Sequence, residues 1–345
     1  MGAQRPLITR RQLAQLGSLV ALSATFGCGK RDQVAVLSAL VTEVVLEMAR
    51  SLRSESSALL KTLRALSSEP SDEHQRSAQA AFTRATLAWK QASAFKAGAF
   101  VSSNAFQRAV FWPARPALID GVLDASESID EPRIEALPVD ARGLYALEYL
   151  LFDAKSVSVM VLANDPHGAR ARAYALELGA NVDGYARRLQ HLLGDGANFA
   201  KSLASGGKGS VDILVAQALD TLAIVAGKFD RIERAHRENL PLPFAVEGYF
   251  SKSSQQIVLS IMNGTRLLYL GAGSGGLSDL VRASSKPIDE HVRASFQVAE
   301  QQLGALGMPL ETAFDQQPQR FQAAVASVRE LRHVLEVEMQ SALSG

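Results

Sequence analysis

Apolar residues recur at helical spacing along almost the whole chain after residue 33. In the first long segment, every third or fourth position is apolar, at Leu37, Val41, Val44, Met48, Leu52, Leu59, Leu63 and Leu66. The same spacing predicts helices at about 166–193, 211–237, 246–270, 287–305 and 319–342. No run of alternating apolar and polar residues is long enough to predict a strand. The pattern therefore predicts an all-α fold.

Polar and glycine-rich breaks divide these helices into two groups. Ser71 can cap a second helix, which carries Ala78, Phe82, Ala85, Trp89 and Ala92 on one side. Four prolines interrupt residues 98–139, which predicts a loop with short helical turns. The glycine-rich stretch 194–210 is the best candidate linker. We therefore expect two packed helical-bundle halves, at residues 29–205 and 206–345.

The first 28 residues have the layout of an export signal. Arg10 and Arg11 precede a modest apolar run from Leu13 to Phe26, which ends at Gly27 and Cys28. The arginine pair and the weak hydrophobicity resemble a twin-arginine signal. Cys28, the only cysteine, looks like a lipidation site. A buried N-terminal helix and simple signal cleavage are the alternatives.

Composition narrows the class of protein. The chain has 345 residues, of which 47% are apolar, so it can bury a large core. Its formal net charge is +1, whereas nucleic-acid binders usually carry a strong basic excess. We therefore expect no nucleic-acid partner.

The segment 142–153 places a carboxylate inside an otherwise apolar helix. Leu144, Leu147 and Leu151 form a core-facing stripe, and Glu148 lies among them. Tyr145 and Glu148 are three residues apart, so they share one helical face. Either the phenol hydrogen-bonds the carboxylate as a satisfied buried pair, or both side chains reach one ligand.

This segment resembles the Gly-x-His-x-x-Glu motif of the imelysin family, with Gly143 and Glu148 in place and Tyr145 where the family has histidine. Further short segments extend the resemblance over most of residues 35–340. Upstream lie Trp89, Phe95 and the step Phe111-Trp112-Pro113; downstream lie Glu247-Gly248-Tyr249-Phe250-Ser251 and the helix ending at Leu270-Gly271.

The resemblance implies an exported protein of the periplasm or cell surface with a site in the cleft between two helical halves. It places Tyr145, Glu148, Glu247 and Ser251 at that site. Glu247 and Ser251, spaced four apart, have a plainer explanation as the first turn of a helix with an acid near its dipole. We expect a lipid-anchored, non-catalytic protein that binds a metal or another ligand in iron acquisition, with the membrane and iron-transport components as its partners.

The replacement of the family histidine by Tyr145 affects which of the alternative functions the sequence favours. A zinc peptidase needs about three protein ligands and an open water position, so the change to Tyr145 weakens the imelysin-type metallopeptidase alternative. Iron fits the change better, because phenolate and carboxylate are hard oxygen donors, and the pair Tyr145 and Glu148 is the candidate metal site. A further alternative is a metal-free module that binds a peptide, a polysaccharide or a partner protein.

Overall fold

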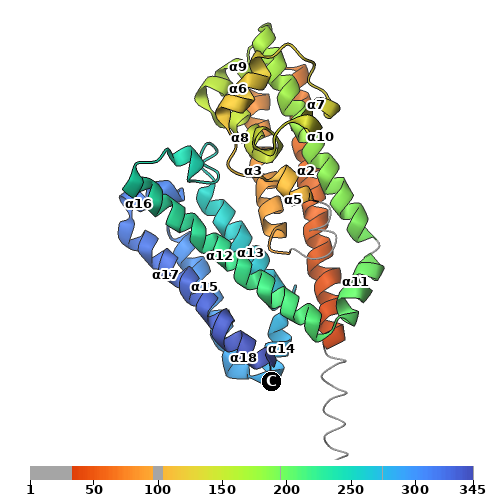
Figure 1. The fold of residues 1–345 in the computed structure, drawn as a ribbon, viewed down its shortest axis with the longest axis vertical. Coiled ribbons are helices and arrows are strands. Elements are labelled where there is room, and N and C mark those ends of the chain that lie inside the picture. The colour runs from red at the N-terminus through yellow and green to blue at the C-terminus, as the bar shows by residue number, and fades with distance from the viewer. Residues whose placement is uncertain (1–32, 96–103, 195, 274, 345) are drawn as a thin grey trace, which may run out of the picture.

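The computed structural model describes residues 33–95, 104–194, 196–273 and 275–344, and throughout these residues the ordered elements are helices (Figure 1). The first half comprises η1 (Leu40–Val45), α2 (Leu46–Ser68), α3 (Asp72–Ala92), α5 (Ala105–Ala109), α6 (Pro116–Asp124), α7 (Glu131–Ala136), η2 (Val139–Ala141), α8 (Gly143–Phe152), α9 (Ala154–Met160), α10 (Pro166–Gly194) and α11 (Gly196–Ser205). The second half comprises α12 (Lys208–Glu238), η3 (Leu242–Phe244), α13 (Ser254–Leu270), α14 (Leu277–Ser284), α15 (Lys286–Gly304), α16 (Leu310–Gln316), α17 (Pro318–Val334), η4 (Leu335–Met339) and α18 (Gln340–Ser344). The all-α prediction is confirmed.

Three long helices, α2, α3 and α10, form the frame of the first half. The helices α6 to α9 pack around one end of it, and α5 packs against α10 and α8 (Figure 1). The predicted caps define their starts. The Ser71 hydroxyl accepts a hydrogen bond from the His74 amide at 3.2 Å, and the Asp165 carboxylate accepts one from the Gly168 amide at 2.9 Å. The predicted apolar stripes of α2 and α3 are buried between the helices.

The second half is built from α12, α13, α15 and α17. The helix α12 is long and apolar enough to span a membrane by length and composition alone. However, half of its apolar window is buried, and α12 packs against α13 and α17. Its hydrophobicity is therefore accounted for by the core of the bundle.

The two halves meet where α3 packs on α13, and one continuous hydrophobic core runs through both. The contact is close at Gly264, where a Cβ atom would lie 2.2 Å from the carbonyl oxygen of Gln91. The Ser260 hydroxyl adds a hydrogen bond to the carbonyl oxygen of Leu87, at 2.7 Å. This junction fixes the position of one half on the other.

Two predicted segments had the wrong bounds, and one helix was not predicted. The helix predicted at 246–270 begins at Ser254, because Gly248 and Lys252 adopt left-handed backbone angles that a helix cannot hold. The predicted linker 194–210 contains the helix α11, and the loop after α13 is followed by the unpredicted helix α14. The predicted signal 1–28, with Arg10, Arg11 and Cys28, lies outside the described residues.

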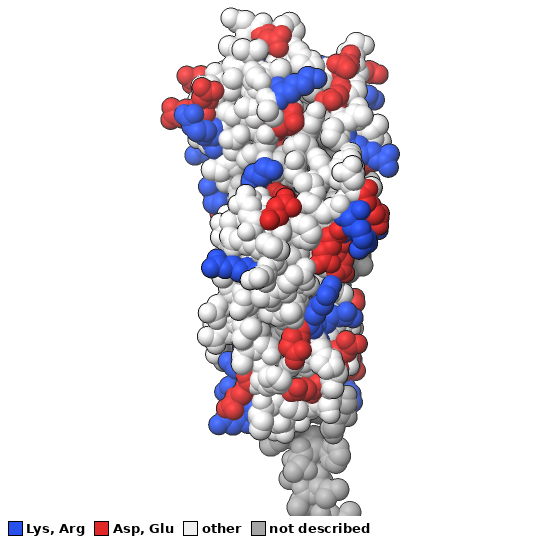
Figure 2. All heavy atoms as spheres, turned by 90° about the vertical axis from the view of Figure 1, so that its left-hand side faces the viewer, with Lys and Arg blue, Asp and Glu red and all other residues white. Residues whose placement is uncertain are grey.

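Basic and acidic side chains are interspersed over the face shown in Figure 2, with uncharged surface between them. This distribution matches the net charge of +1. That face therefore lacks the continuous basic surface by which proteins bind a nucleic-acid backbone.

Candidate functional site

A cavity of about 330 Å³ opens between the two halves. Its walls are mainly apolar and come from α3, α5, the loop after α5, α12 and α13. Its polar lining includes three charged side chains that are almost entirely buried: Lys90, Lys228 and Glu247. Of the four site residues predicted from the sequence, Glu247 is the one that lines this cavity.

Glu247 receives hydrogen bonds from three directions. Its Oε1 atom accepts from the Nζ atom of Lys90 and from the phenol of Tyr145, each at 2.5 Å. Its Oε2 atom accepts a short ion-pair hydrogen bond from the Nζ atom of Lys228. These donors come from α3, α8 and α12, so Glu247 joins both halves of the molecule.

The charges explain how each group titrates. Burial alone would raise the pKa of Glu247, but the ammonium groups of Lys228 and Lys90 lower the pKa well below its ordinary value. Burial, together with the Glu247 carboxylate, raises the pKa of Tyr145. Glu247 is therefore ionised and Tyr145 is a neutral donor at neutral pH. Two lysines face this one carboxylate; burial lowers the pKa of Lys228, and the Glu247 carboxylate acts in the opposite direction.

Glu148 has a different partner. Its Oε1 atom accepts hydrogen bonds from the Ser251 amide at 3.0 Å and from the Ser251 hydroxyl at 2.5 Å. Burial raises the pKa of Glu148 to about 7, although the bonds from Ser251 lower it. The alternative in which Tyr145 hydrogen-bonds Glu148 is therefore not what the structure has: each residue bonds across the interface, Tyr145 to Glu247 and Glu148 to Ser251.

Glu247 and Ser251 lie in a turn before α13 and not in a helix. Gly248 has φ of 78° and accepts a backbone hydrogen bond from the Ser253 amide at 3.0 Å, which closes the turn. A Cβ atom at Gly248 would lie 2.7 Å from the side chains of Ile257 and Ser253. This tight turn aims both side chains of the second motif at α8.

Gly143 fixes the start of the motif helix α8. Its φ is 74°, and a Cβ atom there would lie 2.6 Å from the carbonyl oxygen of Ala109. The glycine therefore lets α8 approach the end of α5. Tyr145 and Glu148 take their positions from this approach.

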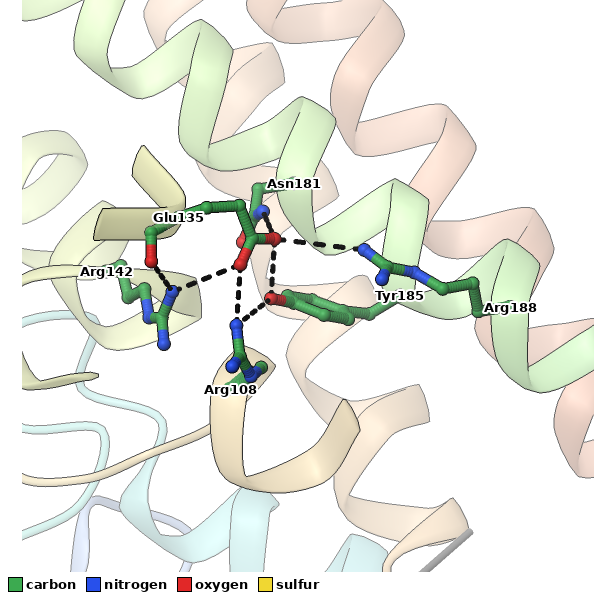
Figure 3. Close-up of polar contacts among 6 residues, drawn as sticks. All are labelled: Arg108, Glu135, Arg142, Asn181, Tyr185 and Arg188. Carbon is green, nitrogen blue, oxygen red and sulfur yellow. Dashed lines mark hydrogen bonds and ion pairs between the residues drawn. The ribbon is translucent and has the colours of Figure 1, made fainter. Parts of the chain in front are cut away.

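A cluster around Glu135 braces the same region (Figure 3). The Glu135 carboxylate accepts from Arg108 at 2.6 Å, from the Tyr185 hydroxyl at 2.7 Å and from the Asn181 amide at 2.8 Å. Arg142, the residue before α8, donates to the backbone carbonyl of Glu135 at 2.8 Å. Burial opposes ionisation of Glu135, but the bonds from Tyr185 and Asn181 and the charge of Arg108 give it a lowered pKa. The cluster ties α5, α7 and α10 to the start of α8.

Comparison with known proteins identifies the family. The family model described as Imelysin matches residues 45–335. The chain belongs to the imelysin family. No curated protein matches it.

Two solved structures share the fold. One, from Parabacteroides distasonis, is described as an iron-regulated protein A precursor; it has a TM-score of 0.75 and 16% identity, with 91% of this chain and 95% of that chain covered. The other is an imelysin-like protein from Psychrobacter arcticum, with a TM-score of 0.72, 12% identity, and coverage of 91% and 96%. These likenesses, at such low identity, concern the fold alone.

The imelysin-type site of this chain does not fit a bare metal ion. Both oxygens of Glu247 are hydrogen-bonded to ammonium groups, and Tyr145 stays protonated and donates a hydrogen bond to Glu247. Across the described residues, no three His, Cys, Asp or Glu side chains form a group that could hold a metal ion. The metal pair Tyr145 and Glu148 stays a prediction, and these contacts weigh against it.

Sequence reasoning missed Lys90 and Lys228. The sequence around each lysine could have indicated that it is buried. Lys90 follows Trp89 on a helix with a buried apolar face. Lys228 is the first basic residue after Lys208 in a long apolar run. A lysine in such a place is usually paired when it is buried. The sequence did not show that both lysines share one carboxylate.

Proposed function

We propose that this chain is an exported, lipid-anchored and non-catalytic binding protein of the imelysin family that holds a small anionic ligand in the cleft between its halves. The observation that carries the proposal is the pair of buried lysines, Lys90 and Lys228, against one carboxylate in an apolar cavity. Ammonium groups buried in an apolar cavity favour an anionic ligand, because charge-assisted hydrogen bonds strengthen where water is excluded.

An iron-acquisition role is compatible with this cleft if iron enters as an anionic chelate. Lys90 and Lys228 already bind the Glu247 oxygens that a bare cation would need as ligands. A ferric polycarboxylate carries negative charge outside its metal, so the lysines can bind its carboxylates while the metal keeps its own ligands. The Parabacteroides protein that shares the fold is described as iron-regulated, which motivates this choice.

Calorimetry tests the ligand class with citrate, ferric citrate and chelator-free Fe²⁺ under anaerobic conditions. We expect citrate and ferric citrate to bind the wild-type protein, and Lys228→Gln to weaken both about tenfold or more, because one charge-assisted contact is lost. Lys61→Gln, which removes an exposed lysine on α2, is the matched control. Tight binding of Fe²⁺ without binding of citrate would overturn the proposal.

The metallopeptidase alternative has its own test. The carboxylate at the cavity, Glu247, is locked by three donors and has a pKa too low to accept a proton at neutral pH. We therefore expect no cleavage of casein or insulin chains beyond a Glu148→Gln control, with or without zinc. Cleavage that a chelator abolishes, and that Glu148→Gln lacks, would establish the peptidase.

A further inference from the structure

A second cavity adjoins the one that Lys90 and Lys228 line. It has a volume of about 390 Å³ and lies on the other side of Trp112, which lines both cavities. Its remaining lining comprises Pro113, Arg231, Arg234, Leu240, Pro241, Phe244 and Ala245. Among the described residues, the lining of this second chamber therefore contains two arginines and no acidic side chain; Asp230 and Glu233 line a neighbouring hollow with the same arginines.

The helix α12 runs along both chambers. Lys228 lines the first, while Arg231 and Arg234 line the second, so successive turns of one helix present a cation. A further hollow, which Asp220 also lines, shares Lys228 with the first chamber and Arg231 with the second. Six residues of α-helix separate Lys228 from Arg234, which is about 9 Å along the helix axis.

Trp112 is held between the two chambers by cations on α12. The Arg231 guanidinium lies 5.1 Å from its ring centroid, and the Lys228 ammonium lies 6.0 Å from it. Such contacts fix an aromatic ring without using the hydrogen-bonding capacity of the cations. In the described part of the chain, neither Arg231 nor Arg234 forms an ion pair. Their donors are therefore available to a ligand.

Apolar side chains surround the arginines of the second chamber. Leu240 and Phe244 are 41% and 48% exposed, which is unusual for large apolar residues placed side by side at a cavity. An exposed apolar rim beside unpaired cations favours a ligand that carries both apolar surface and negative charge.

We propose that the two chambers form one extended site for a dianionic ligand, with one anionic group at Lys90 and Lys228, an apolar middle along Trp112, and the second anionic group at Arg231 and Arg234. This inference rests on the proposed function and specifies its ligand class. Dicarboxylates with an aliphatic or aromatic spacer are the simplest ligands of this kind.

Three probes test the proposal on the whole protein by calorimetry: octanoate, suberate and succinate. Octanoate and suberate have the same chain length, but only suberate carries a second carboxylate at the far end. Succinate carries two carboxylates too close together to reach both chambers. We expect suberate to bind about tenfold or more tightly than either of the others, since one additional charge-assisted contact supplies such a difference.

Arg234→Gln locates the second contact. Because Arg234 is exposed and makes no ion pair in the described structure, the variant should fold as the wild type does. We expect it to reduce the affinity for suberate to that for octanoate and to leave octanoate binding unchanged. The matched control is Arg64→Gln, at an exposed arginine on α2.

The outcomes separate the two proposals. Equal affinity for suberate and octanoate in the wild-type protein, or equal weakening of both by Arg234→Gln, would overturn the extended site while leaving the anion-binding cleft intact. Absence of binding for all three probes and for citrate would overturn both.

Discussion

At the scale of single residues, the site consists of two buried carboxylates with opposite environments. Glu247 is surrounded by positive charge, so its pKa is lowered. Glu148 accepts from Ser251, but burial and the charges of Glu247 and Glu311 raise its pKa to about 7. The two residues therefore affect stability in different pH ranges. Glu247 stabilises the fold above its unfolded pKa of about 4.5 and loses this contribution in acid.

Glu148 should make the protein less stable as the pH rises from about 4.5 to about 7. Its folded pKa lies above its unfolded pKa, so the folded protein binds more protons in this window and stability falls with pH. In the wild-type protein, the free energy of unfolding should fall by up to about 3 kcal/mol across this window, and Glu148→Gln should abolish that fall. Urea unfolding across pH 4.5–8 measures it, with Glu73→Gln, an exposed carboxyl, as control. Parallel profiles for Glu148→Gln and the wild type would contradict the prediction.

Tyr145→Phe should remove one hydrogen bond to an ionised group and keep the ring in place. Because Lys90 and Lys228 continue to pair with Glu247, we expect a loss of only about 1.5–3 kcal/mol in the free energy of unfolding. Tyr249→Phe is the control, since the Tyr249 hydroxyl makes no hydrogen bond within the described residues. Equal unfolding free energies for the two variants would show that the Tyr145 bond is not formed.

At the scale of elements, three close backbone approaches position the site. Gly143 lets α8 reach α5, Gly248 closes the turn before α13, and Gly264 lets α13 pack on α3. Gly143 and Gly248 belong to the two family motifs, so steric crowding explains why each motif has glycine at that position.

Gly264→Ala should push α13 away from α3 and so open the junction of the halves. Its Cβ atom would meet backbone, which cannot move aside as a flexible side chain can, so we expect a loss of about 1–3 kcal/mol. Gly184→Ala on α10 meets nothing within 4 Å, so it should be neutral or stabilise by about 0.5–1 kcal/mol. Thermal unfolding compares them. If both behave alike, the close contact at Gln91 is absent.

At the scale of the whole molecule, α3, α8 and α12 each bring one donor to Glu247, which the turn before α13 carries. The site thus depends on the two halves being held together. We expect any change at the junction that separates the halves to weaken ligand binding as well as stability.

The location of the protein is a separate prediction. Cys28→Ser should move it from the membrane fraction to the soluble periplasm, because the acyl anchor would be lost. Arg10→Lys with Arg11→Lys should block export through a twin-arginine pathway. Cell fractionation with immunoblotting measures both. Unchanged fractionation of both variants would contradict the lipoprotein prediction.

From the sequence alone, the long helices, most of their ends, the family and two motif segments could be predicted. These are local properties, since apolar spacing, capping residues and glycine positions act within a few residues of the chain. The sequence also selected Tyr145, Glu148, Glu247 and Ser251, which the fold does bring together in pairs.

Only the tertiary structure decided which side chains meet. Spacing on α8 suggested that Tyr145 bonds Glu148, but a helix surface offers neighbours from other elements as well, and the partners came from the turn before α13, 102 and 103 residues away in sequence. Lys90 and Lys228 meet Glu247 from separations of 157 and 19 residues. No local pattern encodes such pairings, because they depend on how whole helices pack. That packing places two lysines on Glu247, and this pairing is the basis of the proposed anion site.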